Sequence, residues 1–267
     1  MLFLSLPSER SVYGAPYIPE IIRKPVTFGY IITALSQRNV TLGKGAARRK
    51  KYIESDGEIM YSDAEEALVV VGIDEAGRGP LAGPLAVGAV SVLERVQQGV
   101  LHTLSIGLGA LRDSKQLTAR ERELWFAALE AAERRGELRF AVTLVSAPVI
   151  DARGISAATR LAVARVLKRL APLPQFSSIL LDGLLAAPKC FREQRTIIHG
   201  DETEPLISLA SIAAKVVRDR YMVRMARRFP SYGFERHKGY GTSAHYAALE
   251  RHGPCLIHRR LFLRGMF

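Results

Sequence analysis

Two adjacent carboxylates, Asp74 and Glu75, follow an apolar run of the sequence. The run at residues 67–73 is rich in β-branched side chains, which predicts a buried strand. Acids at the end of such a strand are costly unless a cation, a metal ion or hydrogen bonds compensate their charge. The turn that follows, Gly77-Arg78-Gly79, strips side chains from the backbone so that a ligand can come close. These residues indicate a metal site of oxygen ligands beside a backbone contact to nucleic acid.

Two further acids follow other apolar segments. Asp182 ends a strand predicted at 178–181, and Asp201 follows one predicted at 196–199. Taken singly, each Asp is an ordinary turn residue. Together they favour convergence, because sites in open α/β sheets gather at strand ends. The side chains of adjacent residues on a regular strand point to opposite faces of the sheet. Asp74 and Glu75 therefore share a site only if the strand twists or ends between them, or if one contributes its carbonyl.

The elements that must position these acids alternate between strands and helices, which predicts an α/β fold. Further strands are expected at Leu85–Leu93 and 138–145. Helices are expected at 119–135, at 156–170 with Ser156 as N-cap, and from 208 to 228. Residues 1–64 show scattered Pro and Gly and little periodicity, so they are expected to be an irregular, flexible extension. Residues 65–267 then form the functional domain.

The charge of the chain indicates a polyanionic partner. Its formal net charge is +12, and residues 215–267 hold twelve Lys/Arg against three Asp/Glu, which gives +9. Nucleic acid is favoured over a membrane, because no separate basic amphipathic helix is present. Two cysteines without a Cys-x-x-Cys spacing argue against structural zinc and a disulfide scaffold. No apolar stretch reaches membrane-span length, and the short apolar start does not resemble a secretory signal, so a cytoplasmic protein is expected.

Six blocks of the sequence resemble, in the same order, the signature of the ribonuclease HII family. They are GIDEAGRGPLAGP at 72–84, DSKQLT at 113–118, LDG at 181–183, GD at 200–201, SIAAKVVRDR at 211–220 and HKGYGT at 237–242, with His245, Gly253-Pro254 and His258-Arg259 after them. The resemblance covers roughly residues 69–262. It implies a ribonuclease H-like mixed sheet flanked by helices, with a C-terminal helical region.

The resemblance also implies an activity and its cofactors. The family cleaves the RNA strand of RNA–DNA hybrids and nicks DNA duplexes 5′ of an embedded ribonucleotide. Two divalent ions, Mn²⁺ or Mg²⁺, are expected, with 5′-phosphate and 3′-hydroxyl products. The implied catalytic and metal-binding residues are Asp74, Glu75, Asp182 and Asp201. Hard oxygen ligands without His or Cys suit these ions better than zinc.

The substrate-binding residues implied by the resemblance lie in three motifs. Gly77-Arg78-Gly79 matches the segment that reads the ribose 2′-hydroxyl, and Tyr240 matches a tyrosine that stacks on the next deoxyribose. Phosphate contacts are expected from Ser114, Lys115 and Lys238, while Lys215 is left undecided between a phosphate contact and a surface lysine. A monomer is expected, and contact with a sliding clamp is left open.

Some positions depart from the family pattern. Glu202 and Glu204 add acids next to Asp201, of which Asp201 is the expected ligand. Ser208 and Ser211 stand in a run that is usually alanine, which is interpreted as a change in packing.

Three alternatives are weighed against ribonuclease HII. The related ribonuclease HIII usually lacks Gly-Arg-Gly and has a folded N-terminal substrate-binding domain, for which residues 1–64 look too short and irregular. A nucleotide-binding α/β protein is disfavoured, since the Gly-x-Gly segment lacks a third glycine and no Gly-Lys-Ser/Thr follows. A non-catalytic basic protein that binds nucleic acid explains the charge but not the strand-end acids.

Overall fold

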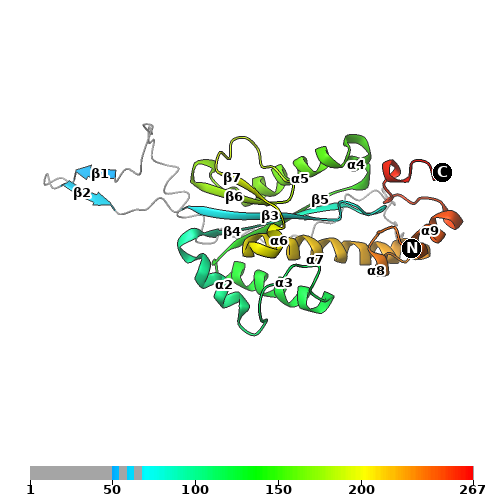
Figure 1. Ribbon diagram of the computed structural model, residues 1–267, viewed down its shortest axis with the longest axis horizontal. Coiled ribbons are helices and arrows are strands. Elements are labelled where there is room, and N and C mark those ends of the chain that lie inside the picture. Colours follow the sequence, from blue (N-terminus) through cyan, green and yellow to red (C-terminus); the bar gives the residue numbers. More distant parts are fainter. Residues whose placement is uncertain (1–49, 54–58, 63–67, 267) are drawn as a thin grey trace, which may run out of the picture. The chain divides into compact units, whose positions relative to one another are not determined.

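The computed structural model describes residues 50–53, 59–62 and 68–266. Its main sheet has five strands in the order β5-β4-β3-β6-β7. The neighbours β3-β4 and β4-β5 are antiparallel, whereas β3-β6 and β6-β7 are parallel. The sheet is therefore mixed (Figure 1). The strands are β3 (Val69–Ala76), β4 (Leu85–Leu93), β5 (Arg139–Val145), β6 (Ser177–Asp182) and β7 (Gln194–Ile197).

The strand that carries the paired acids is longer than predicted. β4 has the predicted bounds, but β3 runs on through Glu75 to Ala76. It continues because its residues stay paired with β4, with Asp74 opposite Gly88 and Glu75 opposite Val87. The strand therefore does not end between the two acids, and their side chains leave it on opposite faces.

Helices cover both faces of the sheet (Figure 1). α7 (Pro205–Arg228) packs against β3 and β4, and the apolar core on this face includes residues of α2 (Gln97–Ser105) and α3 (Ala119–Arg134). Gly72 and Gly88 allow α7 to come close, because a Cβ on either would lie 2.3 Å from the helix backbone. On the other face, α5 (Ile155–Leu170) packs against β4 and β5. α4 (Ala147–Arg153) precedes it.

Three predicted boundaries are wrong. α5 begins at Ile155 after Gly154, which is its N-cap at φ 75°, so Ser156 lies inside the first turn. The last strand of the sheet is β7 at Gln194–Ile197, and His199 instead has a left-handed backbone before α6 (Gly200–Thr203). α7 begins at Pro205, three residues before the predicted 208, since proline fits the first turn of a helix.

The C-terminal region packs around the last turns of α7. Its own apolar core includes Met222, Phe234 and Leu249. This region is tied to the loop after β3, because the N–H groups of Leu81 and Ala82 both donate to the carbonyl of Gly239, at 2.9 and 3.2 Å. Its elements are η3 (Pro230–Tyr232), α8 (Phe234–His237), α9 (Ser243–His252) and η4 (Arg260–Leu263); the remaining short helices are η1 (Glu94–Val96) and η2 (Pro174–Phe176).

Most of the predicted extension at 1–64 lies outside the described residues. Within it, β1 (Lys50–Ile53) and β2 (Ile59–Ser62) form an antiparallel pair that the sequence did not predict. Across the described part of the chain, no helix is both long enough and apolar enough to span a membrane.

Candidate active site

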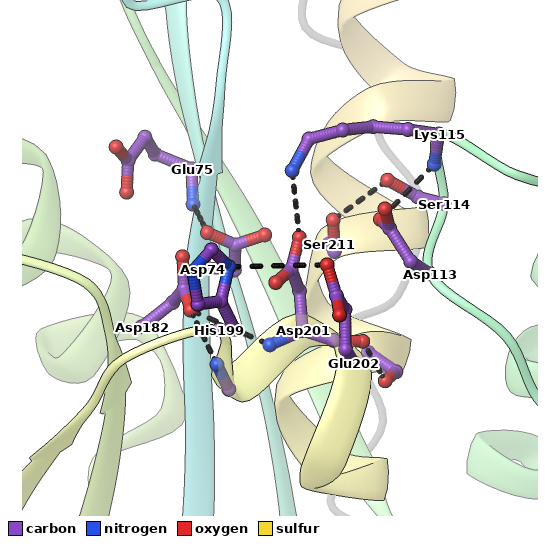
Figure 2. Close-up of polar contacts among 12 residues, drawn as sticks. Asp74, Glu75, Asp113, Ser114, Lys115, Asp182, His199, Asp201, Glu202 and Ser211 are labelled. Carbon is purple, nitrogen blue, oxygen red and sulfur yellow. Dashed lines mark hydrogen bonds and ion pairs between the residues drawn. The ribbon is translucent and has the colours of Figure 1, made fainter.

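Three of the predicted carboxylates lie together at the end of the parallel strands. Asp74, Asp182 and Asp201 each offer an oxygen, and these atoms lie within 4.8 Å of one another (Figure 2). Ile73 of β3 pairs with Leu181 of the parallel strand β6, so the residues that follow them, Asp74 and Asp182, lie at the same level. The expected convergence of strand-end acids is therefore present in the geometry. We call these three residues the acid cluster.

The third member is held by the start of α6. The backbone N–H groups of Gly200 and Asp201 donate to Oδ1 of Asp182, at 2.8 and 3.4 Å. The hydroxyl of Ser208 on α7 donates to the carbonyl of Asp201. Asp201 is 2% exposed. Glu202 is exposed, and its carboxylate lies within 4.8 Å of ligand atoms of His199 and Asp201 rather than in the group with Asp74 and Asp182. Of the neighbouring acids, it is Asp201 that joins Asp74 and Asp182.

Glu75 is the predicted acid that the structure does not bring into this cluster. Its carboxylate points away from Asp201 (Figure 2) and lies 3.6 Å from the guanidinium of Arg78. Its backbone N–H donates to Oδ1 of Asp74 at 2.6 Å. Its contact with the cluster thus runs through the backbone, as the alternation of side chains along β3 requires.

The electrostatics of the acid cluster favour a bound cation. Burial, followed by the negative charge of Glu75, raises the pKa of Asp74 well above its usual range, and Asp182 adds to this. Burial also raises the pKa of Glu75, although Arg78 opposes the shift. An ionised Asp74 is therefore costly in the absence of positive charge nearby.

Lys115 supplies a positive charge at one side of the cluster. Its Nζ lies 2.8 Å from Oδ2 of Asp201 (Figure 2), and this hydrogen bond raises the pKa of Lys115. The lysine side chain is 76% exposed. Ser114, its neighbour, is buried and shares a 2.8 Å hydrogen bond with Ser211.

Ser208 and Ser211 lie beside the acids, although the sequence suggested only a change in packing at these positions. The hydroxyl of Ser211 interacts with Asp74 and lowers its pKa, against the effect of burial. Ser208 contacts Asp201, as described above. Because α7 packs directly on β3, its serines at these positions reach the strand-end acids. The polar replacement of alanine in the 208–211 run was the available signal.

The donor set fits hard divalent ions. The clustered ligand atoms are carboxylate oxygens, with serine hydroxyls beside them, and no cysteine belongs to the group. Mg²⁺ and Mn²⁺ prefer such oxygen ligands, whereas zinc sites in proteins are rich in Cys and His. The residues that would hold an ion are Asp74, Asp182 and Asp201.

Five of the predicted substrate residues lie in two loops that touch each other, while Ser114 and Lys115 lie in the segment before α3. Gly77-Arg78-Gly79 follows β3, and Lys238 and Tyr240 lie between α8 and α9. Gly79 is exposed, with open space where a Cβ would stand, and Tyr240 is 44% exposed. Lys215, left undecided by the sequence, forms a 3.0 Å ion pair with Asp219 and lies 5.9 Å from the centre of the Tyr240 ring.

A buried histidine pair supports the loop of Tyr240. His258 Nδ1 accepts from the N–H of Cys255 at 2.9 Å, so its Nε2 carries the proton and faces His245 Nε2 at 3.0 Å. His245 Nδ1 then donates to the carbonyl of Tyr240 at 2.9 Å. The sequence placed both histidines in a motif without assigning them a role.

This pair predicts a loss of stability in mild acid. Burial, then the charges of His245 and His237, lowers the pKa of His258 to about 4, although its bond to Cys255 opposes this. The unfolded histidine binds its proton near pH 6.5, so stability falls as pH drops from 6.5 towards 4, by at most about 2 kcal/mol at pH 5. Urea unfolding at pH 7 and pH 5 measures the change.

His258→Asn should reduce this pH dependence. His102→Asn, at an exposed position of α2, is the matched control and should leave it unchanged. An equal fall in stability for wild type and His258→Asn would contradict the assignment.

Comparison with solved structures places this architecture in a known class. A ribonuclease HII from Archaeoglobus fulgidus, solved in a complex with PCNA, matches with a TM-score of 0.55 and 27% identity, over 71% of this chain and 91% of that one. Ribonuclease H2 from Pyrococcus horikoshii matches with a TM-score of 0.53 and 27% identity, over 73% and 93%. The mixed sheet flanked by helices is the ribonuclease H-like fold of these enzymes, which confirms the predicted fold class.

Sequence comparisons then identify the family. The ribonuclease HII family model matches residues 71–265. Ribonuclease HII of Burkholderia lata is 41% identical over 217 residues, which cover 81% of this chain and 92% of that protein. Ribonuclease HII of Caldicellulosiruptor bescii is 39% identical, over 77% and 95%. The chain belongs to the ribonuclease HII family, and it is an endonuclease of the ribonuclease H type.

Proposed function

We propose that the protein cleaves the RNA strand of RNA–DNA hybrids and nicks DNA duplexes on the 5′ side of a single embedded ribonucleotide, by two-metal-ion hydrolysis. The observation that carries this proposal is the acid cluster, in which three carboxylates each place an oxygen within 4.8 Å of the others. The products would carry 5′-phosphate and 3′-hydroxyl ends. Nicking beside a ribonucleotide begins its excision, so the proposal includes a role in DNA replication and repair. It also places the protein in the cytoplasm.

The acid cluster would hold the ions through the side chains of Asp74, Asp182 and Asp201. Because the Glu75 side chain leaves the opposite face of β3, Glu75 would contribute through its backbone carbonyl. When bound, a pair of such ions activates a water molecule and stabilises the leaving oxygen of an in-line displacement. The protein fixes the carboxylates in advance, because the N–H groups of Gly200 and Asp201 orient Asp182. Lys115 beside Asp201, and Lys238 in the loop between α8 and α9, would bind phosphates and so orient the nucleic-acid strand.

The ribonucleotide would be recognised by the Gly77-Arg78-Gly79 turn. The 2′-hydroxyl is the group that distinguishes RNA from DNA at a single residue, and the open surface at Gly79 allows the backbone to approach it. Tyr240 would stack on the adjoining sugar, which requires no particular base. Its partial exposure, 44%, and its position in the loop bonded to Leu81 and Ala82 support this role.

One nicking assay tests the whole proposal. The protein is incubated with Mn²⁺ or Mg²⁺ and a DNA duplex that contains one ribonucleotide, with an all-deoxy duplex as control. We expect a cut 5′ of the ribonucleotide, no cut in the control, and no activity with EDTA. Well-folded protein that leaves the ribonucleotide duplex intact with either ion would refute the proposal.

Tyr240→Ala should lower kcat/KM for the single-ribonucleotide duplex by about 10–100-fold, because one stacking contact of about 1–3 kcal/mol is lost. Tyr240→Phe keeps the ring and is the matched control, which should retain most of the activity. Preference for the RNA–DNA junction should fall together with rate. Unchanged kinetics in Tyr240→Ala would remove the ring from the site.

The expected partners are nucleic acids, bound by a monomer. The A. fulgidus relative was solved in a complex with PCNA, and this supports a sliding-clamp contact as a proposal for the present chain. Gel filtration with and without a clamp tests both statements.

A further inference from the structure

Two arginines are completely buried behind the substrate loops. Arg218 on α7 and Arg259 before η4 are both 0% exposed. Among the described residues, neither forms an ion pair with a carboxylate. Their hydrogen-bond acceptors are backbone carbonyl groups. Burying a cation without a counter-charge costs folding free energy. The carbonyl groups that accept hydrogen bonds from these two arginines show which parts of the chain the arginines hold in place.

Arg259 binds the turn that would read the ribose. Its Nη2 donates to the carbonyl of Gly77 at 2.6 Å and its Nη1 to that of Arg78 at 2.8 Å. Its Nε donates to the carbonyl of Gly83 at 3.0 Å, further along the same loop. One planar guanidinium therefore fixes three carbonyl groups of the loop after β3.

Arg218 joins this loop to that of Tyr240. It donates to the carbonyls of Pro84 at 3.0 Å and Ala82 at 3.2 Å, and also to that of Lys238 at 2.9 Å. Its guanidinium carbon lies 5.7 Å from the centre of the Tyr240 ring. The same side chain thus contacts both loops that would hold the substrate.

The glycine of the turn makes room for this arrangement. A Cβ on Gly77 would lie 1.9 Å from Nε of Arg218, and Gly77 has a φ of +83°. A Cβ on Gly239, in the facing loop, would lie 2.3 Å from the carbonyl oxygen of Ala82. The two loops are therefore packed backbone to backbone, with the arginines against them. Burial, then the charge of Arg218, lowers the pKa of Arg259 to about 9.

The carbonyl contacts set the direction of the N–H groups. In a trans peptide the C=O and N–H bonds point in opposite directions. Since Arg259 draws the carbonyls of Gly77 and Arg78 inward, the N–H groups of Arg78 and Gly79, which belong to the same peptides, point outward. Within the described part of the chain, neither of these two N–H groups donates a hydrogen bond. They form a pair of outward donors next to the open surface at Gly79.

We propose that Arg259 and Arg218 are positioning residues for ribonucleotide recognition: Arg259 aims the N–H groups of Arg78 and Gly79 at the 2′-hydroxyl, and Arg218 fixes the distance from them to Tyr240. This inference rests on the proposed function of the Gly-Arg-Gly turn. It assigns the discrimination between RNA and DNA to two side chains that do not touch the substrate.

The test is the affinity ratio between a duplex with one ribonucleotide and the same all-deoxy duplex. Binding is measured with Ca²⁺ in place of Mn²⁺, and a gel verifies that the duplex stays intact. Arg259→Lys retains the charge but not the planar fork, and its ratio should fall about tenfold, as expected for one lost hydrogen bond. Arg260→Lys, at the exposed neighbouring position, is the matched control and should keep the wild-type ratio.

The ratio separates positioning from a loss of folded protein. A smaller folded fraction weakens binding of both duplexes equally, so a general structural effect leaves the ratio unchanged. A wild-type ratio in Arg259→Lys and in Arg218→Lys overturns the inference. If the wild-type protein itself shows no preference for the ribonucleotide, then the proposed role of the Gly-Arg-Gly turn fails first.

A second measurement needs no variant. In ¹⁵N-labelled wild-type protein, the amide resonances of Arg78 and Gly79 should shift more with the ribonucleotide duplex than with the all-deoxy duplex. Equal shifts for the two duplexes would overturn the inference even if both arginine variants fail to fold.

Discussion

Asp74→Asn is expected to reduce nicking of a ribonucleotide duplex by roughly 10³-fold or more, while duplex binding stays close to that of wild type. Asp74 is 4% exposed and shares the acid cluster with Asp182 and Asp201. The substitution keeps the shape of the side chain and removes a charge that a divalent ion needs. It leaves the basic surface intact, and the basic surface supplies most of the affinity for the duplex.

The same variant should be more stable than wild type when no metal is present. Because burial and Glu75 raise the folded-state pKa of Asp74, ionisation near neutral pH costs folding free energy, and this cost grows as pH rises above the usual pKa of Asp. Asn removes that cost. Thermal unfolding in EDTA should therefore give a higher Tm for Asp74→Asn, whereas Mn²⁺ should raise the Tm of wild type more than that of the variant.

Glu193→Gln is the matched control, since Glu193 is an exposed acid outside the cluster. It should retain activity and respond to Mn²⁺ as wild type does. Full activity of Asp74→Asn, or a Tm in EDTA below that of wild type, would contradict the assignment of Asp74 as a buried ion ligand. A loss of binding as large as the loss of activity would point to a different role.

Gly72→Ala is expected to destabilise the protein by about 3 kcal/mol or more, which corresponds to a fall in Tm of about 6–12 °C. The new Cβ would lie 2.3 Å from the carbonyl carbon of Leu206 and 2.6 Å from the backbone nitrogen of Ile207, both in α7. Backbone atoms of a buried helix cannot yield as the end of a flexible side chain can. The helix must move away from β3, and with it Ser208 and Ser211 beside the acids.

Gly99→Ala provides the control within the same chain. Gly99 lies in α2 with nothing within 4 Å of an added Cβ, so alanine should leave stability unchanged or raise it by up to about 1 kcal/mol. Differential scanning calorimetry compares the variants. A Tm of Gly72→Ala within about 2 °C of wild type would show that α7 does not pack on β3 at this distance.

The sheet and most of its helices were predictable because their signals are local. The apolar run before Asp74 predicts β3, the alternation over 138–145 predicts β5, and the helical spacing of apolar residues predicts α3. The N-cap of α3 is Thr118, whose side chain forms a capping box with Glu121. Boundaries such as the start of α5 were wrong, since a glycine N-cap at positive φ leaves little trace in side-chain chemistry.

The candidate site was predictable in its acids but not in their arrangement. Acids at the ends of separate strands indicated convergence, and three of the four meet. Which of the two neighbours, Asp74 or Glu75, faces the cluster depends on whether β3 stays paired with β4 beyond Asp74, and pairing is a property of two strands together. The serines of α7 required the helix to be placed on the sheet before their contacts with the acids became visible.

The sequence alone thus determined the family, the strands and the acids, because these depend on residue types and on patterns within one segment. Only the tertiary structure showed which side chains hold the Gly77-Arg78-Gly79 turn in place. Arg259 contacts Gly77 across a separation of 182 residues, and Arg218 fills the space that a side chain at Gly77 would occupy. A glycine that the sequence suggested was open to a ligand is instead packed against a buried arginine, since only the folded chain brings the two together. Gly79 is the open position.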